Sequence, residues 1–193
     1  AKAIKCMNNV KQLGLGWVQY VNDFNSYVPM HLTSTPTTKY GGYILYNNDY
    51  ASRDSSYCDN VVQFCPDYSK DYLDNVKDDS AHAWEFAYIS YGYNTVGVGD
   101  DWYNGYIRHT PEQPAKPGRI KNPSHKILLA DAKMSIAARP YHVIDSLASN
   151  GMINARHSGA ANFLWCDGHA SSDKRGNLLQ MSPLLPSFMG RNQ

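Results

Sequence analysis

The chain has 193 residues, which is enough for one domain with a continuous apolar core. Its 18 Lys and Arg residues nearly balance its 17 Asp and Glu residues, and a net charge of +1 gives no field that would attract nucleic acid. The chain has 42% hydrophobic residues and a mean hydropathy of −0.52, which are typical of a globular protein. No apolar run approaches the roughly 18 residues that a membrane-spanning helix needs. We therefore expect a single globular domain over residues 1–193 that has no nucleic-acid partner.

The first predicted element is an amphipathic helix that ends near Asn25, before Pro29. Gly14 and Gly16 each cost about 1 kcal/mol relative to Ala in a helix interior, so we expect this helix to depend on packing against a sheet. Its apolar face repeats every three or four residues and comprises Met7, Val10, Leu13, Trp17, Val21 and Phe24. Its opposite, polar face comprises Lys5, Asn9, Gln12, Gln19 and Asn22.

Residues 30–79 carry turn residues, tyrosines and charges without sustained periodicity, and we expect mostly loops there. Within them, an apolar run at 61–65 stops at Pro66, and residues 69–77 could form two turns of helix. Aromatic and β-branched residues between 84 and 94 then predict a strand. The following stretch, 97–105, is expected to be an exposed loop.

Two apolar runs predict strands in the last third of the chain. Residues 127–131 form a run that ends at Asp131 and suits a buried central strand. Residues 161–166 form a second run, and Asp167 and Gly168 directly after it predict a two-residue hairpin turn into residues 169–172. The tail at 183–189 is apolar enough that we expect it to pack on the body.

Compact signatures of nucleotide-using and hydrolytic enzymes do not occur in the sequence. Gly97 and Gly99 begin like a dinucleotide-binding loop, but Trp102 replaces its third glycine. The P-loop, the H-E-x-x-H motif and the G-x-S-x-G motif are absent as well. The absence of these motifs weakens the case for catalysis without excluding it, and our prediction that the chain is not an enzyme rests on the resemblance described below.

Oxygen-bearing residues before Gly105 could bind a structural Ca²⁺ ion, although an EF-hand is excluded. Position three of such a loop would be Trp102 and position twelve Pro111, neither of which can serve as a ligand. A calcium loop of another kind and a simple solvated turn both stay open, and no other cofactor is expected. The residues in question are Asp100, Asp101 and Asn104.

Three residues near the predicted hairpin, His157, Asp167 and His169, could face one another as a metal or acid–base site. We favour a structural interpretation, because Asp favours turns and a buried His needs only one acceptor, which Asp167 could be. The four cysteines match no paired C-x-x-C zinc pattern. The sequence therefore leaves metal ligands unassigned.

One aromatic group suggests a second class of function. Trp102, Tyr103 and Tyr106 lie close together on the expected loop and could stack on sugar rings, or they could belong to the core or its rim. On the first interpretation the chain would be a secreted polysaccharide-binding module.

His157 is followed after nine residues by Asp167 and Gly168, with Arg156 before it and His169 after Gly168. Other blocks lie, in order, at residues 6–15, 27–29, 64–66, 90–94 and 120–124 with 128–131. Together these blocks resemble bacterial prepilin-type pseudopilins similar to the type II secretion G subunit, and the block at His157 resembles the signature of this group. Within the signature we interpret His157, Asp167 and Gly168 as a structural hairpin.

The resemblance implies an α+β, pilin-like fold in which the N-terminal helix packs on an antiparallel sheet. It also implies a structural subunit of a type II secretion or type IV pilus-like assembly, whose partners are other pseudopilins and the secretion machinery. Family members carry a basic leader and an apolar segment that anchors them in the inner membrane, with the head in the periplasm or outside the cell. Since this sequence shows neither, we expect a soluble truncation of such a protein.

The compartment implied by the resemblance is oxidising, which permits disulfides. We expect a bond between Cys58 and Cys65, which are close in sequence, and Cys6 with Cys65 is the alternative pairing.

Overall fold

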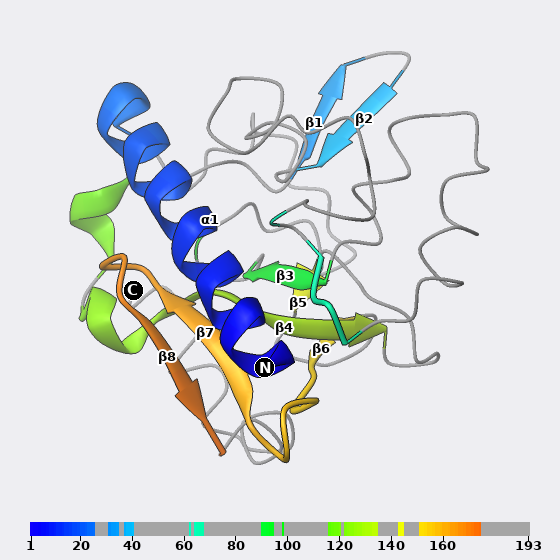
Figure 1. Ribbon diagram of the computed structural model, residues 1–193. Coiled ribbons are helices and arrows are strands. Elements are labelled where there is room, and N and C mark those ends of the chain that lie inside the picture. The colour runs from blue at the N-terminus through cyan, green and yellow to red at the C-terminus, as the bar shows by residue number, and fades with distance from the viewer. Residues whose placement is uncertain are drawn as a thin grey trace.

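The computed structural model describes residues 1–25, 31–34, 37–40, 62, 64–67, 90–94, 98, 116–120, 122–134, 143–144 and 151–174. Within these ranges one helix packs against a sheet, and a separate two-stranded hairpin lies apart from it (Figure 1). The elements in chain order are α1 (Lys2–Phe24), β1 (His31–Ser34), β2 (Thr37–Tyr40), β3 (Tyr91–Asn94), η3 (Pro117–Arg119), η4 (Pro123–His125), β4 (Ile127–Met134), β5 (Val143–Ile144), β6 (Gly151–Ile153), β7 (Ala161–Trp165) and β8 (Ala170–Asp173).

The N-terminal helix forms as its apolar spacing predicts. It ends at Phe24, and Asn25 adopts a left-handed conformation with φ 48°, a common way to stop a helix. Val10, Leu13 and Trp17 are buried, whereas Phe24 is 55% exposed and packs its ring against Tyr20.

The polar face of the helix was predicted incorrectly at one position. Asn9 is buried, and its side-chain amide donates a hydrogen bond of 2.9 Å to the backbone carbonyl of Phe64. A buried amide must find such a partner to offset its desolvation, and the segment at 64–67 supplies it. Asn9 therefore helps to fix this segment against the helix.

The main sheet has the strand order β5-β3-β4-β7-β8, and β6 pairs with the second half of β4. Strand β4, predicted as a buried central strand, pairs with β3 on one side and β7 on the other. Every pairing in this sheet is antiparallel except that of β3 with β5, which is parallel. The expectation of an antiparallel sheet therefore holds for the described strands apart from this edge pair.

An irregularity in β4 decides which side chains face the helix. Ile127 pairs with Trp165, but Leu129 pairs with Leu164, so β4 carries one extra residue at this point. The extra residue reverses the alternation of side chains. Ile127 and Trp165 therefore belong to the apolar cluster on the far face of the sheet, whereas Leu129 and Leu164 join the cluster under α1. Asp131, two residues after Leu129, points to the helix side as well.

The predicted hairpin joins β7 to β8, with a turn one residue longer than predicted. The Trp165 N–H donates to the His169 carbonyl, and the Gly168 N–H donates to the Trp165 carbonyl, so three residues form the connection. Gly168 has φ 90°, which suits the last position of a three-residue turn. The two-residue turn would also require a positive φ at Asp167, which the structure does not have.

Helix α1 crosses the sheet over β7 and β8, as Figure 1 shows. A Cβ atom at Gly14 would lie 2.7 Å from Leu164 Cδ1, which explains why glycine occupies this point of close approach. One turn further along, the ring of Trp17 lies 4.5 Å from the ring of Tyr93. The described residues thus form an α+β arrangement in which β7, β8 and β3 carry the helix.

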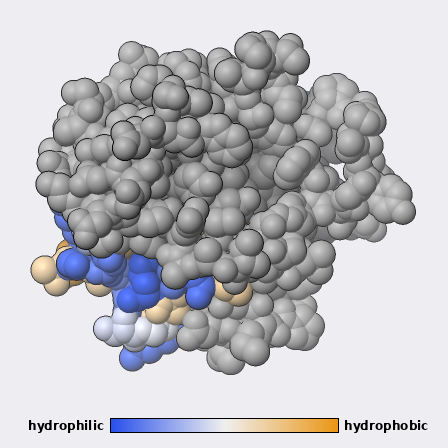
Figure 2. Space-filling view, turned by 90° about the vertical axis from the view of Figure 1, so that its right-hand side faces the viewer, coloured by the Kyte–Doolittle hydropathy of each residue, from blue (hydrophilic) through white to orange (hydrophobic). Residues whose placement is uncertain are grey.

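Several predicted elements lie outside the described residues, namely the helix at 69–77, most of the strand at 84–94, most of the loop at 97–105 and the tail at 183–189. No helix in the described ranges is long and apolar enough to cross a bilayer. In the view of Figure 2, the described residues occupy the lower left edge, where hydrophilic residues stand among apolar ones. This view therefore shows no continuous apolar area on the part of the chain that is described.

Candidate functional site

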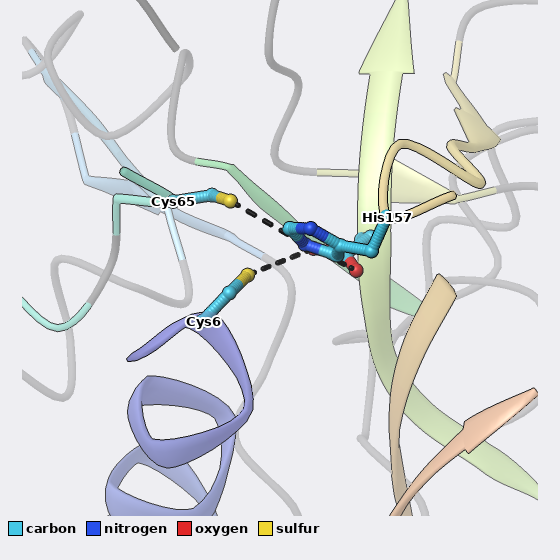
Figure 3. Close-up of side chains that lie close together, drawn as sticks. Cys6, Cys65 and His157 are labelled. Atoms are coloured by element: carbon cyan, nitrogen blue, oxygen red, sulfur yellow. Dashed lines mark hydrogen bonds and ion pairs between the residues drawn. The ribbon is translucent and has the colours of Figure 1, made fainter. Parts of the chain in front are cut away.

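Four side chains with metal-ligand chemistry meet beside the first turns of α1. Cys6 comes from the helix, Cys65 from the segment at 64–67, Asp131 from β4 and His157 from the bridge before β7. One ligand atom from each residue lies within 4.8 Å of the ligand atoms of the other three. Figure 3 shows Cys6, Cys65 and His157 pointing toward one another.

Asp131 carries a fully buried carboxylate surrounded by donors. Its Oδ2 accepts a hydrogen bond of 2.7 Å from the Asn162 N–H, and its Oδ1 accepts one of 3.4 Å from the Cys6 thiol. The Arg156 Nε lies 3.8 Å from Oδ1, and the His157 Nε2 lies 3.5 Å from Oδ2. Such neighbours are needed, because a buried carboxylate without them would be strongly destabilising.

The two ring nitrogens of His157 have different partners. Nδ1 lies 2.7 Å from Asp67 Oδ2, while Nε2 lies 3.6 Å from the Cys65 Sγ. The hydrogen bond with Asp131 and the negative charges of Asp131, Cys65 and Asp67 raise the pKa of His157, although burial acts in the opposite direction. The ring is thus held by a carboxylate on one side and presents its other nitrogen to the cluster.

The thiols of Cys6 and Cys65 are unequal. The hydrogen bond from Cys6, together with the charge of Arg156, lowers the pKa of Cys65 to about 7 even though burial opposes ionisation. The same hydrogen bond and burial raise the pKa of Cys6, and the Tyr91 hydroxyl lies 3.0 Å from its Sγ. Cys65 is therefore the thiol that ionises first and the more nucleophilic or metal-binding of the two.

Backbone contacts fix the cluster on three sides. The Cys65 N–H donates a 2.8 Å hydrogen bond to Ser90 Oγ, which joins the 64–67 segment to the start of β3. Arg156 donates to the carbonyl groups of Ser90 and Ala132, and so links β3, β4 and the segment before β7. His157 and Ala160 exchange two backbone hydrogen bonds of 3.0 Å around a tight turn. The side chains of the cluster are thus oriented by the sheet itself.

The site that the sequence suggested at His157, Asp167 and His169 is not formed. Asp167 Oδ1 lies 2.6 Å from His169 Nδ1 in the β7–β8 turn, but His157 lies at the opposite end of β7 and contacts Asp67 instead. A five-residue strand separates the two ends by roughly 16 Å. The acceptor for His157 is therefore Asp67 and not Asp167.

Other predicted site residues lie outside the described part of the chain. They are Cys58, the aromatic residues Trp102, Tyr103 and Tyr106, and the calcium candidates Asp100, Asp101 and Asn104. In the structure Cys65 and Cys6 are both free thiols, and they lie together in the cluster. The disulfide between Cys58 and Cys65 stays a prediction.

No local motif marks Asp131 or Asp67 as a site residue or connects Cys6 with His157. A signal was nevertheless present, because Cys6, Cys65, Asp131 and His157 each lie within one of the blocks that resemble pseudopilins. Those blocks are far apart along the chain, and the fold brings them to one place.

Comparison with known proteins gives no further assignment. No family model, no curated protein and no solved structure matches the chain.

Proposed function

We propose that this chain is a pseudopilin, a structural subunit of a type II secretion or type IV pilus-like assembly. The ordered sequence blocks and the packing of α1 against a mainly antiparallel sheet support the proposal. The main observation in its support concerns the face of α1 that points away from the sheet, which we call its outer face. Among the described residues, the large hydrophobic side chains that are exposed all belong to this helix: Ile4, Leu15, Val18 and Phe24.

Three of these side chains form a stripe along the helix. Ile4 and Leu15 are eleven residues apart, about three helical turns, and Val18 follows about one turn later. Cys6, Val10 and Trp17 lie on the opposite, buried face. The helix therefore buries one face against its sheet and exposes three apolar side chains on the other, among the polar residues Asn8, Lys11 and Asn22, with Leu15 73% exposed.

We assign this outer stripe to contacts with the α1 helices of neighbouring pseudopilins. Apolar area on a helix gains free energy when a partner removes it from water, at about 25 cal/mol per Å². In the proposed assembly, the helices stack in the fibre and the heads face outward. The function is mechanical, with no chemical step, and an apolar segment ahead of α1 would anchor the subunit in the inner membrane before assembly.

A photo-cross-linking amino acid at Leu15 tests this assignment in cells that express the complete gene with its secretion genes. Ser172 is a suitable control position, because it is exposed and belongs to β8, not to the outer face of α1. We expect adducts between pseudopilin subunits from position 15 and none from position 172. Equal adduct yields at both positions, or none from position 15, would overturn the proposal.

A further inference from the structure

We propose that Cys6, Cys65, Asp131 and His157 form a closed, four-coordinate Zn²⁺ site that ties the start of α1 to the sheet. Two thiols, an imidazole and a carboxylate are the ligand types that zinc prefers in proteins. They come from four separate segments, and all four side chains are buried. This inference does not depend on the proposed assembly.

Three distances between the ligand residues fall in the range of a zinc tetrahedron. Bond lengths of about 2.0–2.3 Å to nitrogen, oxygen and sulfur place neighbouring ligand atoms about 3.3–3.8 Å apart. Cys6 Sγ lies 3.4 Å from Asp131 Oδ1, His157 Nε2 lies 3.5 Å from Asp131 Oδ2, and Cys65 Sγ lies 3.6 Å from His157 Nε2. These three distances involve both oxygens of Asp131, and the other pairs of ligand atoms lie within 4.8 Å, so binding zinc would draw the side chains closer together.

The groups around the ligands match the supporting contacts of a zinc site. A histidine that binds zinc through one nitrogen usually donates the N–H of the other to a carboxylate, which fixes the ring. Asp67 occupies this place at 2.7 Å from His157 Nδ1, while Nε2 faces the cluster. Asp131 is oriented in the same way by the Asn162 N–H.

The arrangement indicates a structural metal. Catalytic zinc keeps one position for water or substrate, whereas here four protein ligands fill a tetrahedron away from solvent. On binding, the thiol protons leave to solvent and no redox partner is needed.

A disulfide between Cys6 and Cys65 is the competing state of the same thiols. It would remove two of the four ligands, and it leaves unexplained why Nε2 of a buried histidine and a buried carboxylate face the two sulfurs. Zinc binding excludes this disulfide, and it equally excludes the predicted bond between Cys58 and Cys65, which would remove Cys65 from the site. Thiol counting distinguishes these states.

The test uses the purified chain with its thiols reduced by a phosphine, loaded with Zn²⁺ or Co²⁺ and desalted. We expect one metal ion per chain, and for Co²⁺ the visible absorption of a tetrahedral ion together with a thiolate charge-transfer band. Cys6→Ser should lose the tight site and most of the charge-transfer intensity. Cys166→Ser removes a buried thiol outside the cluster and should bind metal like the unchanged protein.

Asp67→Asn provides a variant that keeps all four ligands and alters only the support of His157. We expect Zn²⁺ binding to weaken about 10- to 100-fold in a chelator competition, with one ion per chain retained. Circular dichroism of each variant verifies that it folds. The proposal is overturned if the reduced protein gives no tetrahedral Co²⁺ spectrum, if Cys6→Ser binds Zn²⁺ as tightly as Cys166→Ser, or if the protein from its native cells carries a Cys6–Cys65 disulfide.

Discussion

Replacing Trp17 by alanine tests whether α1 is held on the sheet as the structure places it. Trp17 is 2% exposed, and its ring packs against Tyr93 at 4.5 Å. Leu15, two residues earlier on the same helix, is 73% exposed and provides the matched control. Leucine and alanine have similar helix propensities, so the two variants differ mainly in what their side chains bury.

The loss expected for Trp17→Ala follows from the buried area. A tryptophan side chain buries about 150–250 Å², which at about 25 cal/mol per Å² corresponds to about 4–6 kcal/mol. Alanine keeps its methyl group and the site relaxes in part, so we expect the free energy of unfolding to fall by about 3–5 kcal/mol. Leu15→Ala should change it by less than about 0.5 kcal/mol.

Urea unfolding followed by far-ultraviolet circular dichroism measures both changes without depending on tryptophan fluorescence. If Trp17→Ala does not fold, Trp17→Leu should still lose about 1–3 kcal/mol. Losses of similar size at positions 15 and 17, or a loss below about 1 kcal/mol for Trp17→Ala, would show that the helix does not pack on this face.

Three further substitutions test individual contacts by the same unfolding assay. Asn9→Ala should lower the free energy of unfolding by about 1–3 kcal/mol, because it leaves the buried carbonyl of Phe64 without its donor. Asn8→Ala, at an exposed position, should be nearly neutral. Equal losses would refute the buried hydrogen bond. Gly14→Val should lower the free energy of unfolding by about 1–3 kcal/mol, because its side chain would clash with Leu164. Gly14→Ala should change it by no more than about 1 kcal/mol, because the higher helix propensity of alanine offsets a smaller clash. A neutral Gly14→Val would contradict the close approach of α1 to β7. Asp167→Ala should lower the free energy of unfolding by about 0.5–1.5 kcal/mol, because it removes the hydrogen bond from the His169 N–H in the turn. The loss should be the same with and without a chelator. A loss that is seen only without chelator would indicate that Asp167 is a metal ligand.

Local patterns predict the elements that carry their own periodicity or turn chemistry. The apolar spacing of α1, the runs at the start of β4 and in β7, and Asp167 with Gly168 at the turn are all readable over a few residues. β5 and β6, in contrast, are only two and three residues long and gain their structure from pairing with distant strands. Their sequence carries no periodic signal, and the parallel pairing of β5 with β3 is a tertiary feature.

The candidate site could not be predicted in the same way, because its residues meet only in the folded chain. Cys6 and Asp131 are 125 residues apart, and the side of β4 on which Asp131 lies depends on the irregularity between Ile127 and Leu129. A regular alternation would have placed Ile127 and Asp131 on the same face. His157 was identified as a candidate, but its partners were sought along the hairpin, whereas they lie across the sheet.

The location of α1 within an assembled fibre tests the central claim most directly. Cryo-electron microscopy of fibres from cells that express the complete gene would locate this helix relative to its neighbours. We expect α1 helices packed around the fibre axis, with Ile4, Leu15 and Val18 buried between subunits and the sheets facing outward. Fibres built from other subunits, with this chain absent or with the outer face of its α1 exposed to solvent, would contradict the assignment.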